Sequence, residues 1–208
     1  MAVDLAALVQ PWRTAVVTSE VQNGVVGEDA ILPELAEVAR GGMIPSLARL
    51  VKSARAAGVE VVHATYERRV DGKGGNVNAR LFNALADVPV KLLRGSAAVK
   101  VVPEVGVEPT DLVLPRSHGL NPISGTDLEP VLRNMGVSTI VVTGVSVNVA
   151  ITNLVMEAVN RGFEVVLPRD AVCGVPADYA ESVIDNTLSL LATVTTVDEM
   201  TTIWERDG

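Results

Sequence analysis

The chain has 208 residues, of which 48% are hydrophobic, and its 25 acidic and 17 basic residues give a formal charge of −8 at neutral pH. This is an ordinary globular composition at one-domain length, so we expect one domain over residues 1–208. The acidic balance and the lack of a long Lys/Arg run argue against a nucleic-acid partner, because phosphate binding needs a clustered positive face.

The cysteine content and the hydropathy pattern indicate the cellular compartment in which the protein is expected. Cys173 is the one cysteine, which excludes an intrachain disulfide and a CxxC metal site and fits a reducing cytoplasm. The N-terminal sequence lacks a basic region ahead of its apolar residues, and no run of 18 apolar residues follows. We therefore expect a soluble cytoplasmic protein that has no membrane partner.

Three segments share one pattern, a helix-like stretch followed by a glycine and a β-branched run. They read LVKSARAAGVEVVHAT, LEPVLRNMGVSTIVVTG and LVMEAVNRGFEVVLPRD. Gly58, Gly136 and Gly162 come where a helix end favours a left-handed residue, and the valines after them predict strands buried on both faces.

Further strands are predicted at Thr14–Ser19, Asp111–Pro115 and Ala192–Val197. Together the segments predict an α/β fold with about six mostly parallel strands and helices on both faces. In such a sheet, ligands bind beyond the carboxyl ends of the strands, so the residues that follow strands are the candidates for function.

Polar residues follow several of these strands. Glu20 and Gln22 follow the first strand, Arg116 and His118 follow the strand DLVLP, and the segment from Gly144 to Ala150 leads from a strand into a helix. If the first strand and DLVLP are neighbours in the sheet, Glu20 and Arg116 converge on one pocket as a charge pair.

These stretches resemble the isochorismatase-like hydrolase superfamily, also called cysteine hydrolases. The resemblance runs from about Thr14 to Thr196 and is carried by VVTSEVQN, LVLPRSHGLNPISGTDL and TGVSVNVAITNLVMEAVNRGFEVVLPRDAV. It implies a three-layer Rossmann-like domain and a homo-oligomer. It also implies a cis peptide bond between Val145 and Ser146, with the N–H groups of Ser146 and Ala150 forming an oxyanion hole.

The chain departs from the family pattern at three positions. The resemblance aligns Glu20, Arg116 and Ala150 with an aspartate, a lysine and the nucleophilic cysteine. Ala150 closes the acyl-enzyme route, since it has no nucleophile. Arg116 can orient anions but cannot pass on a proton near neutrality. Glu20 keeps the carboxylate and reaches roughly 1.5 Å further than aspartate.

Two hypotheses follow. The first is an isochorismatase-like hydrolase that acts on a small anionic metabolite without a cysteine nucleophile, with Glu20 as general acid/base and Arg116 as an anchor for the substrate. The second is a catalytically inactive member that binds a small ligand or serves as an assembly partner. Under the first, Gln22, Ser146 and Asn148 are candidate substrate contacts.

The remaining polar candidates have structural alternatives. His118 is as suited to structuring its loop as to binding substrate, and Asn148 is also suited to capping a helix. His63 is expected to pack at the end of the second strand and Cys173 to serve in packing. We expect no cofactor and no metal, because the segment from Tyr66 to Arg68 lacks the Asp-x-His pattern of the metal-containing relatives.

Overall fold

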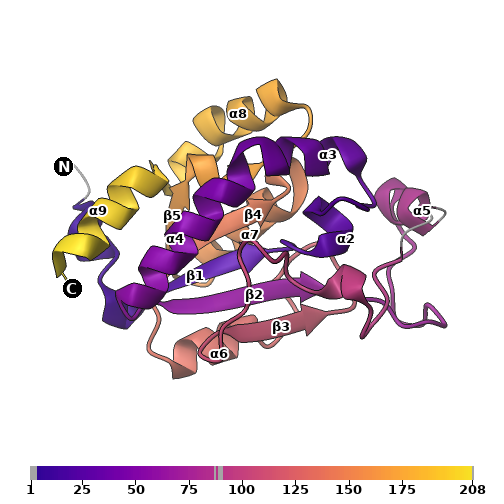
Figure 1. Cartoon of the computed structure of the whole chain (residues 1–208), viewed down its shortest axis with the longest axis horizontal. Coiled ribbons are helices and arrows are strands. Elements are labelled where there is room, and N and C mark those ends of the chain that lie inside the picture. The colour runs from indigo at the N-terminus through magenta and orange to yellow at the C-terminus, as the bar shows by residue number, and fades with distance from the viewer. Residues whose placement is uncertain (1–3, 87, 89–90, 208) are drawn as a thin grey trace.

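The computed structural model describes residues 4–86, 88 and 91–207, so both ends of the predicted domain 1–208 lie outside the described part. A parallel sheet forms the middle layer, and helices cover both of its faces (Figure 1). The predicted α/β fold is confirmed. No described helix has the length and apolar character that a membrane span requires.

Among the described residues, seven strands form one sheet in the order β3-β2-β1-β4-β5-β7, with β6 paired to β4. Every pair of neighbouring strands is parallel. The prediction of about six strands did not include β6, which is too short to show a periodic pattern. The strands are β1 (Thr14–Ser19), β2 (Glu60–Tyr66), β3 (Leu112–Arg116), β4 (Thr139–Val145), β5 (Glu164–Pro168), β6 (Val172–Cys173) and β7 (Thr193–Thr195).

The helices lie before, between and after these strands. They are α1 (Leu5–Leu8), α2 (Asn23–Val26), α3 (Pro33–Val38), α4 (Ile44–Ala56), α5 (Arg80–Ala86), α6 (Leu128–Asn134), α7 (Thr152–Asn160), α8 (Ala177–Asn186) and α9 (Val197–Asp207). The predicted left-handed glycines after α4, α6 and α7 are confirmed, because Gly58, Gly136 and Gly162 have φ angles of 74°, 76° and 73°. Each of these helices therefore stops at its glycine, and the chain turns into the next strand.

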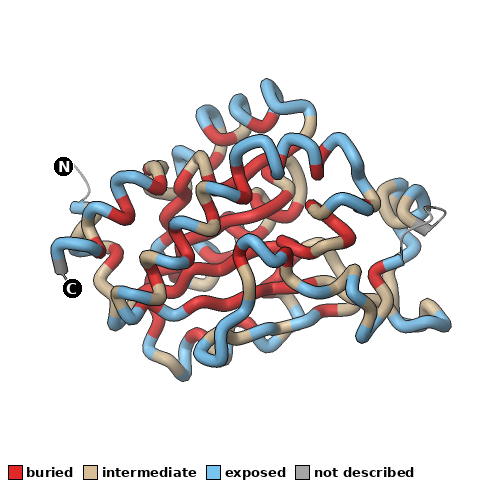
Figure 2. The backbone as a smooth tube through the Cα atoms, viewed as in Figure 1, coloured by how far each residue is buried: buried red, intermediate tan, exposed pale blue. Residues whose placement is uncertain are grey.

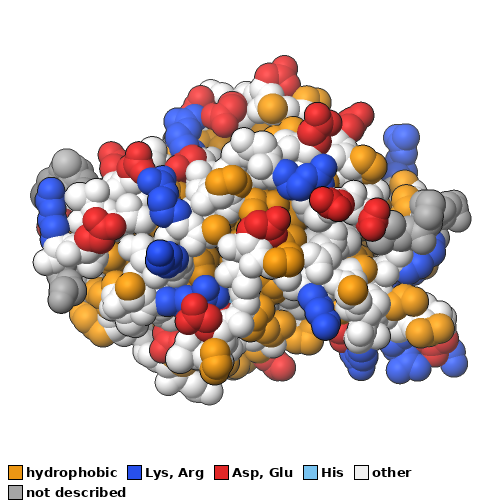
Figure 3. Space-filling model, viewed as in Figure 1, with side chains coloured by type: hydrophobic (Ala, Val, Ile, Leu, Met, Phe, Trp, Pro, Cys, Tyr) orange, Lys and Arg blue, Asp and Glu red, His pale blue; other side chains and the backbone are white. Residues whose placement is uncertain are grey.

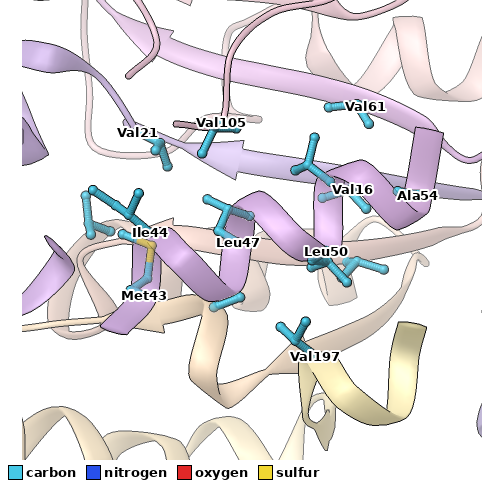
Figure 4. Close-up of a cluster of buried hydrophobic side chains, with 14 of the residues drawn as sticks. Val16, Val21, Met43, Ile44, Leu47, Leu50, Ala54, Val61, Val105 and Val197 are labelled. Carbon is cyan, nitrogen blue, oxygen red and sulfur yellow. The ribbon is translucent and has the colours of Figure 1, made fainter. Parts of the chain in front are cut away.

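Helix α4 shows why these segments are helical. Leu47, Leu50, Val51 and Ala54 recur at helical spacing and are fully buried, which is the pattern of a helix with one face on a core. In Figure 4 the labelled side chains of α4 lie in one cluster with Val16 on β1, Val61 on β2 and Val197 on α9.

The buried apolar side chains of the described residues form two clusters, one on each face of the sheet. Leu47, Leu50 and Trp204 belong to the cluster under α3, α4 and α9. Leu132 and Leu154 belong to the cluster under α6, α7 and α8. Figure 2 shows the strands as buried segments between helices whose outer turns are exposed. The sheet is therefore a rigid platform, and its carboxyl edge positions the loops that follow.

Candidate active site

Two adjoining cavities lie at the carboxyl edge of the sheet. The larger has a volume of about 540 Å³ and the smaller about 90 Å³. Both are lined by Glu20, Ile31, Leu81, Leu85 and Leu120. The two cavities are thus parts of one cleft, and Glu20 lies where they join.

Glu20 follows β1 in a backbone conformation that is unusual for a glutamate. Its φ angle is +56°, in the left-handed region that favours glycine. Its N–H donates to the carbonyl oxygen of Ala64 on β2 at 3.0 Å, and its own carbonyl accepts from the N–H of Gln22 at 2.9 Å. These bonds hold the strained residue in place, and such residues cluster at functional sites.

Arg116 ends β3, and its side chain is only 3% exposed. Its Nη2 donates to Oε1 of Glu20, whose side chain is 21% exposed. The condition under which we expected this pair, that β1 and β3 are neighbours in the sheet, does not hold, because β2 lies between them, yet the pair forms. Two strand spacings of about 4.8 Å separate β1 from β3, and two long side chains span them at the carboxyl end of β2, where Arg116 is level with Tyr66.

The guanidinium of Arg116 is only partly satisfied. Its central carbon lies 5.3 Å from the ring centroid of Tyr66, within the range of a cation–π contact. Its Nε and Nη1 are buried and have no hydrogen-bond partner among the described residues. Unpaired buried donors are rare and need an explanation, and a bound acceptor group is one.

The turn after β4 forms another wall of the larger cavity. The peptide bond between Val145 and Ser146 is cis, as the resemblance implied. The carbonyl oxygen of Ser146 accepts hydrogen bonds from the N–H groups of Val149 and Ile151, each at 3.1 Å. This pattern widens the helical turn that leads into α7, and wide turns of this kind are frequent at functional sites.

Two small residues shape the same turn. Gly144 has a φ angle of +99°, and a Cβ at this position would collide with the backbone of Ser19 on β1. Only glycine allows β1 and β4 to approach this closely. Ala150 is 5% exposed and lines the larger cavity. At the position where the resemblance implies a nucleophile, the chain therefore presents a methyl group.

The predicted substrate contacts fall into two groups. Ser146 and Asn148 line the larger cavity together with Glu20 and Ala150. His118 is exposed, lies against Gly125 and lines neither of the two cavities. The structure thus brings Glu20, Arg116, Ala150, Ser146 and Asn148 together and leaves His118 at the surface.

Gln22 is also absent from the lining of both cavities. It is fully buried, and its Nε2 donates to the carbonyl oxygens of Tyr66 at 2.9 Å and Val99 at 2.8 Å. Its Oε1 accepts from the N–H of Tyr66 at 2.8 Å. Gln22 therefore ties the end of β2 to the segment before β3, and its contact with the site is indirect.

Sequence reasoning missed the apolar walls of the cleft. Ile31, Leu81 and Leu85 come from a loop and from α5, away from the strand ends that drew attention, and Leu120 lies in the loop after β3 without a periodic pattern. The helical spacing of Leu81 and Leu85 in RLFNALA was the one available signal.

A protein-family model described as the isochorismatase domain matches residues 14–199. The chain belongs to the isochorismatase family. Ureidoacrylate amidohydrolase RutB of Rhizobium rhizogenes is 25% identical over 205 residues, which cover 91% of this chain and 82% of that relative.

Solved structures of isochorismatase-family proteins share the fold. A cysteine hydrolase from Pseudomonas syringae pv. phaseolicola has a TM-score of 0.81 at 24% identity, covering 97% of this chain and 96% of its own. An isochorismatase family protein from Burkholderia thailandensis has a TM-score of 0.77 at 26% identity, covering 93% and 96%. The first shows likeness of fold alone.

This isochorismatase-family chain holds a second buried charged group, which we call the Asp111 cluster (Arg55, His63 and Asp111). His63 lies in the middle of β2, fully buried, and not at its end as predicted. Its Nδ1 lies 2.9 Å from the hydroxyl of Thr18, and its Nε2 lies 3.3 Å from Oδ2 of Asp111. Arg55 donates to the same oxygen at 2.5 Å. Burial lowers the pKa of His63, although Asp111 acts in the opposite direction.

Cys173 lies in β6 and lines neither cavity of the cleft. It lines a separate cavity of about 270 Å³. Burial raises the pKa of its thiol to about 12, so its thiolate is scarce near neutrality.

Proposed function

We propose that the chain is a hydrolase of a small anionic metabolite that works without a cysteine nucleophile, with Glu20 as general acid/base. The observation that carries the proposal is the Glu20–Arg116 ion pair at the junction of the two cavities. A buried ion pair adds little stability, because desolvation offsets much of the attraction. The left-handed backbone of Glu20 costs roughly 1–3 kcal/mol more. Groups held at such a cost in a cleft are candidates for chemistry.

The bond cleaved is of the amide type, which the name of the amidohydrolase relative supports. The carboxylate of Glu20 accepts a proton from a water molecule, and the water oxygen bonds to the carbonyl carbon of the substrate. The N–H groups of Ser146 and Ala150 stabilise the resulting oxyanion. Protonated Glu20 then gives its proton to the leaving nitrogen as the C–N bond breaks. The carboxylate is thereby restored.

Arg116 has two roles in this scheme. Its Nη2 fixes the carboxylate of Glu20, and its unpartnered Nε and Nη1 favour an acceptor group of the substrate. A guanidinium stays protonated near neutrality, so it orients and stabilises anions and takes no part in proton transfer.

Covalent catalysis by another side chain has little support. A serine nucleophile needs a neighbouring base, and neither His63 nor His118 lines the cavity that contains Ser146. Glu20 lines that cavity, but in this scheme it activates the water molecule. Cys173 lines neither cavity of the cleft, and its pKa of about 12 keeps it protonated.

One observation favours the second candidate, an inactive family member that binds a ligand. Ala150 presents a methyl group where the resemblance implies a nucleophile. Under this reading the cleft binds a small molecule, and a ligand raises the melting temperature without any turnover.

The deciding experiment measures hydrolysis of isochorismate and of simple amides by the parent chain and by two matched variants. Glu20→Gln keeps the shape of the side chain and removes its charge, so we expect turnover to fall by roughly 10²–10⁴-fold. Glu34→Gln changes the other carboxylate that lines the larger cavity, and its turnover should match that of the parent. Equal turnover in Glu20→Gln and the parent would contradict the proposal. Ligand-induced melting shifts without turnover in the parent would favour the inactive member.

A further inference from the structure

We infer that the molecule recognised by this cleft is amphipathic, with an anionic head in the smaller cavity and an apolar body in the larger. The inference rests on the proposed function in one respect, since it takes Glu20 as the group that faces the reacting bond. It adds the substrate class, which neither the ion pair nor the family membership specifies.

The larger cavity is built for apolar groups. Its walls include Ile31, Leu32, Leu81, Leu120 and Val149. These apolar side chains offer no hydrogen bonds, so burying a polar group against them carries a desolvation penalty. The polar lining residues of the cavity are Glu20, Glu34, Ser146 and Asn148. A volume of about 540 Å³ lies within the range of pockets that bind drug-sized molecules. The fitting occupant is therefore a hydrocarbon chain or ring.

The smaller cavity shares apolar walls with the larger one and differs from it in its cations. Arg68, Lys91 and Arg116 line it, and Glu20 is the one acidic residue among its described lining residues. Arg68 and Arg116 thus place two guanidinium groups in this cavity, in a chain whose net charge is −8. In Figure 3, Lys and Arg side chains gather on the right of the view, around α5 and the loop after β2.

Arg116 gives the second, independent sign of an anionic occupant. Its side chain is 3% exposed, and two of its nitrogens have no acceptor among the described residues. A buried donor without an acceptor costs free energy, which a carboxylate oxygen would recover. With a volume of about 90 Å³, the smaller cavity has room for a head group and little more.

Glu20 joins the two halves. It lines both cavities, and the larger also contains Ser146 and Ala150. A molecule that spans the cleft places its central bond beside the carboxylate of Glu20. The apolar body then extends toward Leu32 and Val149, which line the larger cavity and not the smaller.

The inference is tested by binding alone, with probes that have no bond to hydrolyse. Isothermal calorimetry of the parent chain with butanoate, hexanoate and octanoate should show affinity rising about fourfold per methylene, equivalent to ~0.8 kcal/mol per buried CH₂. Hexanoate should bind at least about tenfold more tightly than 1-hexanol, because the alcohol lacks the charge that Arg116 and Arg68 bind.

Variants separate the two halves. Leu32→Asn changes a residue that lines the larger cavity and not the smaller, so it should flatten the dependence on chain length. Leu190→Asn, at a position 80% exposed, should leave that dependence unchanged. Arg68→Gln should reduce the preference for hexanoate over 1-hexanol and leave the effect of chain length intact. We choose Arg68 for this variant and not Arg116, because Arg116 belongs to the proposed catalytic pair.

The outcomes distinguish this inference from the proposed function. Affinity that does not rise with chain length, equal binding of hexanoate and 1-hexanol, or no binding of any probe would overturn the inference. If any of these results came with Glu20-dependent turnover of short amides, the proposed hydrolase function would be supported and the amphipathic substrate would be contradicted. The expected binding pattern together with no turnover would support the amphipathic ligand and contradict the proposed hydrolase function.

Discussion

The Glu20–Arg116 pair and the Asp111 cluster are both buried and charged, yet they differ in how well they are satisfied. Arg116 pairs with Glu20 and keeps two nitrogens without partners. Asp111 is 1% exposed, and both of its oxygens contact donors, from Arg55 and from His63.

This difference in hydrogen bonding indicates the role of each group. A carboxylate can only accept, so Nε2 of His63 carries the proton and Nδ1 accepts from Thr18. The Asp111 cluster is thus closed and serves the fold. The Glu20–Arg116 pair opens on a cleft and has unused hydrogen-bonding capacity, which suits a ligand.

Breaking the closed cluster should have the largest effect on stability. Asp111→Asn removes the closer and more buried of the two carboxylates that pair with Arg55, so we expect the free energy of unfolding to fall by roughly 3–5 kcal/mol. Urea denaturation followed by circular dichroism measures this. Asp71→Asn is the matched control, because Asp71 pairs with Arg69 at the surface and such pairs contribute little. Equal losses in the two variants would contradict the role of the Asp111 cluster.

A thiol introduced into the cleft can be compared with the buried thiol of Cys173 outside it. Ala150→Cys puts the thiol in the larger cavity, whereas the pKa of Cys173 is raised to about 12 by burial. We expect iodoacetamide to alkylate the introduced thiol about 100-fold faster than Cys173, measured by peptide mass spectrometry. Turnover of amides above the parent level would show that Glu20 and Arg116 can serve a nucleophile there. Equal alkylation of both sites would mean that position 150 does not face the cleft.

The pH dependence of stability is the smallest of these effects and again concerns the closed cluster. Burial lowers the pKa of His63, so the unfolded chain binds the proton first as the pH falls. The contribution of His63 is complete above pH ~6.5 and is lost as the pH falls from there through its folded pKa. The melting temperature should therefore drop between pH 7.5 and 5.

His63→Gln should show a smaller drop over the same range, and His118→Gln, at an exposed position, should behave as the parent does. Asp111 also has a lowered pKa, because hydrogen bonds from Arg55 and others outweigh its burial, but its effect lies below pH ~3.8. A full drop in His63→Gln would assign the pH dependence to other groups.

Local patterns were enough to predict the sheet and the strand ends. The glycines after α4, α6 and α7 and the valine runs after them placed β2, β4 and β5, and parallel strands then brought Glu20 and Arg116 to one edge. The order of β1, β2 and β3 was not predictable in the same way, because strand order depends on contacts between distant segments.

The same limit applies to the site. Gln22 bonds to Tyr66 and Val99, which are 44 and 77 positions away, so its structural role leaves no local pattern. Asp111, the carboxylate partner of His63, is 48 positions away in the sequence. The apolar walls from α5 and Leu120 depend on loop placement. The homo-oligomer, the cytoplasmic location and the lack of a metal or cofactor stay predictions.

The most direct test compares kcat in two charge-removing variants of matched shape, Glu20→Gln and Asp111→Asn, under conditions where both are folded. Our account predicts that kcat falls at least about 100-fold in Glu20→Gln and stays near the parent value in Asp111→Asn. Parent-like turnover in Glu20→Gln, or equal losses in both, would contradict the claim that the pair in the cleft carries the chemistry.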